Sequence, residues 1–223
     1  MRKQKLNPIL LPERLLNDIF PYNRKGGWDE KTSAVEEFKE TIKKELRNNQ
    51  NNRCAYCDLP LDSRNPEIDH IAPKGGSIRP KYVEWTFLPL NLVYACHNCN
   101  SSECKGQKDV VVENSSSNYE KCIFSIVHPY FDQPSEYFHM SDDGFIYPIP
   151  KIDADEYHKK KAKKTIDMFK LNEEGKLTEI LKQIEFDKNP EGIQKKLKRL
   201  LHTNPSFRFP LMLSITKLRI QLQ

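Results

Sequence analysis

The chain has 223 residues, of which 37% are hydrophobic and 30% charged, and its formal net charge is +5. No stretch approaches the roughly 18 apolar residues of a membrane span, and the start, MRKQKLNPIL, lacks the apolar core of a signal peptide. These features favour a cytoplasmic protein of α+β type over a membrane or secreted protein.

The net charge is unevenly distributed along the chain. Residues 157–223 hold 16 basic and 7 acidic side chains, whereas residues 1–156 hold 20 basic and 24 acidic ones. A basic C-terminal region indicates a polyanionic or acidic partner, or else only a solvated helix face. The composition leaves these alternatives open.

The cysteines form two CxxC pairs, Cys54 with Cys57 and Cys96 with Cys99, separated by 38 residues. Two such pairs can place four thiolates tetrahedrally around one Zn²⁺. A reducing compartment disfavours disulfides, so the spacing predicts a structural zinc site, and four ordinary buried cysteines are the alternative.

The N-terminal region predicts one amphipathic helix after an irregular stretch. Thr32 or Ser33 can cap the helix, and basic residues near Arg47 suit the negative end of its dipole. Four apolar residues recur at helical spacing. They are Val35, Phe38, Ile42 and Leu46.

Two extended pieces follow the first CxxC pair, at 59–61 and 67–71. The turn-rich residues 62–66 between them predict a hairpin. A loop is expected from Lys74 to about residue 90. A helix from Leu92 to Cys104 is then expected to carry the second CxxC pair.

The C-terminal half predicts short strands and then helices. Strand-like runs lie at 110–112 and 122–127, and residues 142–144 have the composition of a hairpin turn. Helices are expected over 153–170, 173–186, 191–202 and 209–221. Three regions are therefore predicted: an N-terminal segment and helix (1–50), a core with the cysteine pairs (51–108), and a mainly helical, basic, partner-binding region (109–223).

Three motifs lie in order around the cysteines. They are Glu67-Ile68-Asp69-His70-Ile71-Ala72-Pro73, then Asn91, then Cys96-His97-Asn98-Cys99-Asn100. Together they resemble the HNH nuclease family of the zinc-knuckle kind. The resemblance implies a ββα-metal finger with a four-cysteine zinc site, embedded in a mainly helical domain, and metal-dependent hydrolysis of nucleic-acid phosphodiesters.

The chemistry of the central motif agrees with this resemblance. Phosphodiester hydrolysis needs a base that activates water and a cation that neutralises charge. An imidazole can accept a proton at neutral pH, so His70 is the predicted general base. Neighbouring strand residues face opposite sides, so Asp69 and His70 are expected to point in different directions. Asp69 is then predicted to reach a catalytic Mg²⁺ or Mn²⁺ while His70 faces the attacking water.

The remaining roles follow from the resemblance or from charge. The resemblance implies that Asn91, at an expected helix start, holds the loop that orients the base, and that Asn100 is the second ligand of the divalent ion. His97 stays an alternative ligand. Lys74 and, with a departure from the family's spacing, Lys105 are candidates for contacts with nucleic-acid phosphates.

Motifs further along the chain narrow the resemblance. Residues 132–138, 143–146 and 162–172 resemble the PtuB-like HNH proteins of Septu and retron anti-phage systems, which occur beside the ATPase PtuA. The resemblance implies a nuclease effector with a PtuA-like ATPase partner and, in a retron system, a reverse transcriptase and its msDNA. DNA is the favoured substrate. A ribonuclease acting on tRNA and a non-catalytic, zinc-dependent binding or adaptor module are the alternatives.

Overall fold

The computed structural model describes residues 4–24, 26–62, 64–74, 81–114, 118–141, 144–149 and 156–189. The chain divides into two compact units, Met1–Lys176 and Leu177–Gln223. The helices predicted at 191–202 and 209–221 lie outside the described residues. The predicted region boundaries at residues 50 and 108 stay a prediction.

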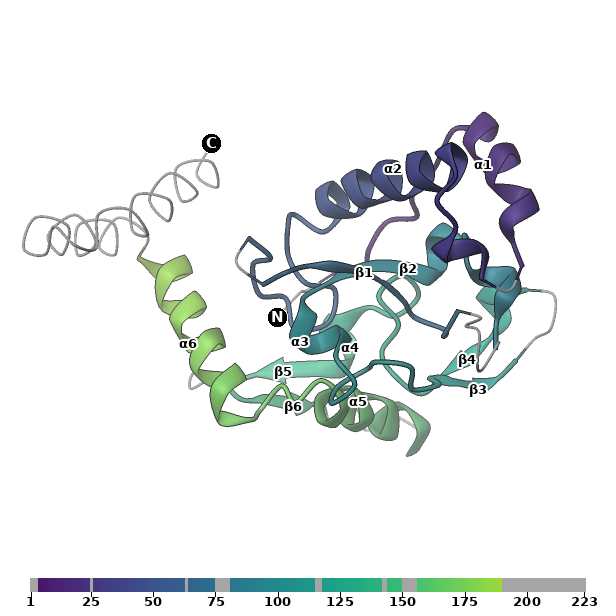
Figure 1. Cartoon of the computed structure of the whole chain (residues 1–223). Helices are drawn as coiled ribbons and strands as arrows, with labels where there is room; N and C mark the ends of the chain where they lie inside the picture. The colour runs from purple at the N-terminus through teal and green to yellow at the C-terminus, as the bar shows by residue number, and fades with distance from the viewer. Residues whose placement is uncertain are drawn as a thin grey trace, which may run out of the picture. The chain divides into compact units, whose positions relative to one another are not determined.

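Pairs of short strands lie between helices along the first unit (Figure 1). The α-helices are α1 (Glu13–Ile19), α2 (Ser33–Asn49), α3 (His97–Asn100), α4 (Pro134–Tyr137), α5 (Glu156–Met168) and α6 (Glu174–Lys188), the last running into the second unit. The strands are β1 (Glu67–His70), β2 (Leu92–Ala95), β3 (Val111–Glu113), β4 (Ile123–Phe124), β5 (Phe138–Met140) and β6 (Ile146–Pro148). Within the described residues they pair as three antiparallel ribbons, β1–β2, β3–β4 and β5–β6. The α+β class is confirmed.

Helix α2 forms as its sequence predicts. The Thr32 hydroxyl accepts a hydrogen bond from the Val35 amide at 3.4 Å and caps the first turn. All four residues of the predicted apolar stripe are fully buried. This face packs on the β1–β2 ribbon, because α2 contacts β2 in the first unit (Figure 1).

Gln50 joins the end of α2 to β2. Its side-chain amide donates to the carbonyls of Arg53 and Tyr94, both at 2.7 Å, and its carbonyl accepts from the Tyr94 amide at 2.8 Å. Gln50 is only 1% exposed. One buried carboxamide therefore fixes the helix end against the strand that leads to the second CxxC pair.

The predicted hairpin of 59–61 with 67–71 is wrong. Strand β1 pairs instead with β2, in a register that sets Asp69 opposite Val93 and His70 opposite Leu92. Residues near 60 turn back on the first CxxC pair, through a bridge between Arg53 and Pro60. The partner of β1 comes from far along the chain, so local turn composition did not reveal it.

The helix predicted from Leu92 to Cys104 is also wrong. Leu92–Ala95 is a fully buried strand, and only His97–Asn100 forms a single helical turn before Ser101 returns to an extended conformation. A short, continuous apolar run has no periodicity that separates a buried strand from a buried helix.

The later elements mostly follow the prediction. The strand-like runs become β3 and β4, and β5 and β6 flank the predicted turn, of which residues 142 and 143 lie outside the described part. Helix α5 packs through a buried side that contains Ala162, Thr165 and Ile166. Among the described residues, none of the helices has the length and apolar content needed to cross a bilayer.

Candidate metal and nuclease centre

The two CxxC pairs come together in the structure. The Sγ atoms of Cys54, Cys57, Cys96 and Cys99 all lie within 4.8 Å of one another, and all four residues are buried. The Cys57 and Cys96 sulfurs are 3.9 Å apart, close to the roughly 3.8 Å expected for two ligands of a tetrahedral zinc with bonds of about 2.3 Å. The cluster could therefore bind zinc.

Backbone geometry builds this cluster. Asp58, with a φ of 58°, directs its amide to the Cys54 carbonyl at 3.0 Å and so closes the first turn. The Cys96 amide donates to the Cys54 sulfur at 3.4 Å. Amide donors of this kind stabilise thiolates, the form that binds a metal.

Lys176 adds a positive charge beside the sulfurs. Its ammonium lies 3.2 Å from the Cys99 sulfur. Burial lowers the pKa of Lys176, but the charges of Cys57, Cys99 and Cys96 outweigh this effect and raise it above its ordinary value. The lysine therefore stays charged and offsets the negative charge of a four-thiolate site.

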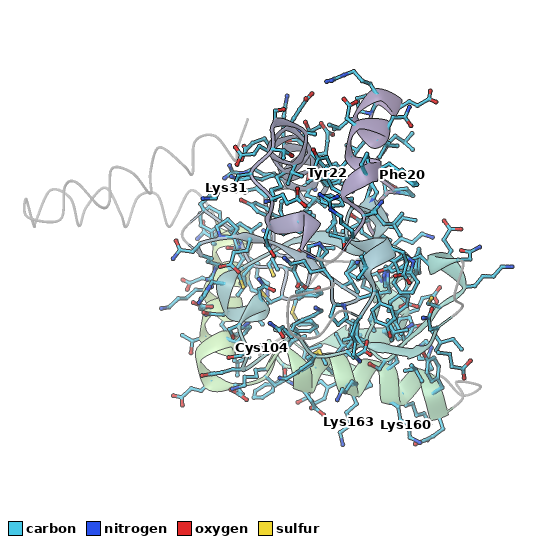
Figure 2. The ribbon with its side chains drawn as sticks, turned by 45° about the vertical axis from the view of Figure 1, so that its right-hand side comes forward. Phe20, Tyr22, Lys31, Cys104, Lys160 and Lys163 are labelled. Carbon is cyan, nitrogen blue, oxygen red and sulfur yellow. The ribbon has the colours of Figure 1, made fainter. Side chains whose placement is uncertain are left out.

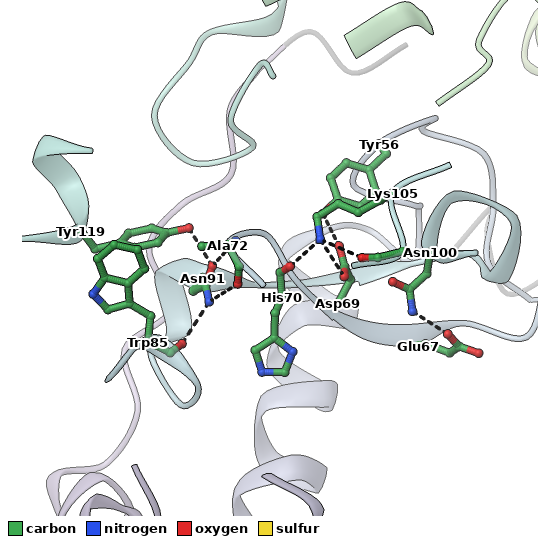
Figure 3. Close-up of polar contacts among 11 residues, drawn as sticks. Tyr56, Glu67, Asp69, His70, Ala72, Trp85, Asn91, Asn100, Lys105 and Tyr119 are labelled. Atoms are coloured by element: carbon green, nitrogen blue, oxygen red, sulfur yellow. Dashed lines mark hydrogen bonds and ion pairs between the residues drawn. The ribbon is translucent and has the colours of Figure 1, made fainter. Parts of the chain in front are cut away.

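Asp69 points from β1 into the protein interior (Figure 3). One carboxylate oxygen accepts from the Tyr56 hydroxyl, and the other lies 3.3 Å from the Lys105 ammonium. Burial raises the pKa of Asp69, while Lys105 and the Tyr56 hydrogen bond act in the opposite direction. Both oxygens of this predicted metal ligand therefore already have partners.

Lys105 is 1% exposed, so its ammonium is directed into the protein and not toward solvent. Besides Asp69, it donates to the His70 carbonyl at 2.6 Å and to the Gly106 carbonyl at 3.4 Å. These three acceptors hold the Lys105 ammonium next to the end of β1. The sequence had suggested instead that Lys105 contacts a nucleic-acid phosphate.

His70 lies on the other face of the strand. Its Nε2 is 2.9 Å from the Thr86 carbonyl, and its ring meets the edge of Trp28 with centroids 4.5 Å apart. A carbonyl can only accept, so Nε2 carries the proton and Nδ1 keeps a free lone pair. Burial, followed by the charge of Lys74, lowers the pKa of His70 to about 3. The imidazole is therefore neutral at pH 7, the form that a base requires.

Lys74 and His70 both lie against the Trp28 ring. The Lys74 ammonium contacts both carboxylate oxygens of Asp29, at 3.0 and 3.2 Å, and lies 5.8 Å from the centre of the Trp28 ring. The side chain is 27% exposed. Lys74 therefore presents a cation that solvent can reach beside the neutral imidazole.

Asn91 is fully buried at the end of a 3-10 turn, directly before β2, and not at the helix start expected from the sequence. Its carboxamide donates to the carbonyls of Ala72 and Trp85, at 3.1 and 3.0 Å, and accepts from the Ala72 amide at 2.7 Å (Figure 3). The Tyr119 hydroxyl donates to the same oxygen at 2.9 Å. Asn91 thus ties the segment after His70 to the turn that contains Trp85.

A buried histidine, which sequence reasoning did not assign to the site, supports Asn91. His128 is fully buried, and its Nδ1 accepts from the Tyr130 amide at 3.2 Å. Its Nε2 therefore carries the proton and donates to the Tyr119 oxygen at 3.0 Å. Burial, with a smaller effect of Lys161, lowers the pKa of His128 well below its ordinary value.

This network predicts that stability falls as the pH is lowered. The unfolded chain protonates His128 near its reference pKa of about 6.5 and the folded chain does not, so lowering the pH to ~5 should cost about 2 kcal/mol of unfolding free energy from this group. Urea unfolding at several pH values measures the slope. His128→Phe should have a smaller slope than the wild type, whereas replacing the exposed His139 by phenylalanine should not. Equal slopes for His128→Phe and the wild type would contradict this assignment.

Asn100 and His97 do not contact Asp69 among the described contacts; they meet Glu67 instead. The Asn100 amide donates to one Glu67 oxygen at 2.6 Å, and His97 Nδ1 lies 3.1 Å from the other (Figure 3). Sequence reasoning missed Glu67. The period of a strand could have identified it, because residues two apart share one face.

The chain matches no protein-family model. It is 31% identical to Septu protein PtuB of Bacillus thuringiensis over 134 residues, 59% of this chain and 41% of PtuB. The chain resembles Septu protein PtuB. This similarity, together with the four-cysteine cluster, confirms the resemblance inferred from the motifs.

Two further relatives are similar in sequence to parts of the chain. The CRISPR-associated endonuclease Cas9 of Corynebacterium diphtheriae is 37% identical over 67 residues, 30% of this chain and 6% of Cas9. Septu protein PtuA of Bacillus mycoides is 24% identical over 155 residues, 64% of this chain and 20% of PtuA. The chain therefore spans less than half the length of PtuB, Cas9 and PtuA.

Proposed function

We propose that this chain is a metal-dependent HNH endonuclease that works in anti-phage defence. The observation that carries the proposal is that β1 presents Asp69 and a neutral His70 on opposite faces, beside a buried cluster of four cysteines. The order β1, β2, α3 is that of a ββα-metal finger. The similarity to PtuB and to a segment of Cas9 supports the same proposal.

In this proposal the residues of the finger have separate tasks. His70 accepts a proton from the attacking water at Nδ1, while the Thr86 carbonyl fixes its tautomer. Asn91 positions the backbone that follows the base. Asp69 and Asn100, with His97 as the alternative, would hold Mg²⁺ or Mn²⁺, which neutralises charge on the scissile phosphate. The four cysteines would hold a structural zinc.

The low pKa of His70 suits a site that gains its full basicity with the substrate. Burial lowers the pKa of His70 most, and the charge of Lys74 is the next largest cause. A phosphodiester that pairs with Lys74 would offset this charge and raise the pKa of His70 toward the range in which a base is effective. The same contact would place the phosphate next to the imidazole.

Exposed lysines on α5 support a nucleic-acid substrate. Lys160 and Lys163 project outward from this helix (Figure 2), and Lys159 and Lys164 are also exposed, whereas Lys161 is turned inward to Asp132 at 2.7 Å. These four lysines outnumber the exposed Glu156 and Asp167 on the same helix side, and the remaining positive charge suits the phosphate backbone of DNA, our first choice, or of tRNA.

The names of the relatives suggest a second protein in the system. PtuA and PtuB are both named as Septu proteins, and the chain is similar to part of each. We propose a PtuA-like ATPase as the partner; a retron reverse transcriptase with its msDNA is the corresponding alternative.

The test is cleavage by the purified chain, alone and with the ATPase, of phage DNA, plasmid and total tRNA. Cleavage is expected with Mg²⁺ or Mn²⁺ and not with excess EDTA. The Asp69→Asn variant, prepared identically, controls for contaminating nuclease. Binding without cleavage under every condition would favour the zinc-dependent binding module instead.

A further inference from the structure

The contacts of Asp69 differ from those expected of a free metal ligand. One of its oxygens faces the Lys105 ammonium and the other accepts from the Tyr56 hydroxyl. The side chains of Lys105 and Asp69 are 1% and 6% exposed. A buried carboxylate needs a nearby positive charge, and Lys105 provides it here.

The other predicted ligands are engaged by a different carboxylate. Glu67 and Asp69 are two residues apart on β1 and share one face. Asn100 and His97 contact the two oxygens of Glu67. The ligands expected around one divalent ion are thus divided between two carboxylates.

The charge of Lys105 disfavours a divalent ion at Asp69. An ammonium and a doubly charged cation on the same carboxylate would repel each other in a site that excludes solvent, where screening is weak. The ammonium also has other partners, the carbonyls of His70 and Gly106, so its position beside Asp69 is well defined.

We propose that Lys105 competes with the divalent cation for Asp69, so that the cation binds only when the ammonium is displaced, and that this exchange sets the affinity of the site. The proposal rests on the proposed function. It makes Lys105 a residue that tunes metal affinity and not a contact for nucleic acid.

The backbone around Lys105 allows this exchange without disturbing the zinc cluster. The Lys105 amide donates to the Cys99 carbonyl at 3.1 Å, and its carbonyl accepts from the Lys108 amide at 2.9 Å. Gly106 follows with a φ of +46°, and a Cβ there would lie 2.9 Å from the Ser102 Cα. These contacts constrain the tight turn, so the proposed exchange requires only the Lys105 side chain to move.

The test is Mn²⁺ binding to the zinc-loaded full chain, measured by titration calorimetry and by the loss of the free Mn²⁺ electron paramagnetic resonance signal. Lys105→Met removes the competing charge and leaves Asp69 buried without a counter-ion. The dissociation constant of this variant for Mn²⁺ should therefore be at least about tenfold lower than that of the wild type. Asp69→Asn and the double variant Asp69→Asn/Lys105→Met should both bind weakly.

Lys108→Met is the matched control. Lys108 lies on the same turn, but its ammonium donates to the backbone carbonyls of Glu103 and Cys104 and not to a carboxylate. Its removal should leave Mn²⁺ affinity unchanged. Zinc content and circular dichroism check folding, and Lys105→Gln, which keeps a donor but no charge, repeats the test if Lys105→Met does not fold.

The outcomes separate the two proposals. If Asp69→Asn weakens Mn²⁺ binding but Lys105→Met and Lys105→Gln bind no more tightly than the wild type, the competition is refuted and the nuclease proposal stands. If no variant shows an affinity that depends on Asp69, both proposals fail.

Discussion

Replacing His70 by glutamine is expected to lower the rate of metal-dependent cleavage by about 10²- to 10⁴-fold, the usual contribution of a general base. A glutamine keeps an amide N–H that can meet the Thr86 carbonyl, the partner of His70 Nε2. It removes the lone pair on Nδ1 that accepts the proton. The measurement is the initial rate of plasmid cleavage at saturating Mg²⁺.

Two comparisons make this result specific. His70→Ala should lose the same activity, and added imidazole should restore part of it, because the free ring can replace the missing base. His139→Ala, at an exposed position on β5, should cleave at the wild-type rate. Normal cleavage by His70→Gln would show that another group acts as the base.

Replacing Cys96 by serine is expected to abolish zinc binding and to unfold the first unit. The Cys96 sulfur lies 3.9 Å from that of Cys57, and the Cys96 amide supports the Cys54 sulfur. A structural zinc contributes about 10–16 kcal/mol, which is comparable to the ~5–15 kcal/mol net stability of most domains. Zinc content and thermal unfolding followed by circular dichroism measure the effect.

Cys122 offers a matched control for this prediction. It is buried, 8% exposed, and lies outside the four-cysteine cluster. Cys122→Ser should keep its zinc and a melting temperature within a few degrees of the wild type. If Cys96→Ser keeps a full complement of zinc, the prediction that this cluster holds a structural zinc is wrong.

Features set by local signals were predictable from the sequence. Helix α2 follows from one cap and one apolar stripe, both of which act within a few turns. The four-cysteine cluster follows from the CxxC spacing, since each pair needs only a tight turn. These predictions required no knowledge of the tertiary arrangement.

Contacts across the sheet were not predictable in the same way. The pairing of β1 with β2, and not with residues near 60, depends on packing between distant segments. Lys105 contacts Asp69, which is 36 positions away in the sequence, and Asn100 contacts Glu67, which is 33 positions away. A motif fixes the order of such residues but not which carboxylate each side chain reaches.

The Gln50 carboxamide has a consequence for how the molecule opens. Because it bonds to both the amide and the carbonyl of Tyr94, the last turn of α2 cannot separate from β2 without breaking two buried hydrogen bonds. Strand β2 leads directly into Cys96. Fraying of the helix end and release of the metal should therefore be coupled in one cooperative transition, so that the amide protons of this turn exchange with solvent more quickly once a chelator has removed the ion.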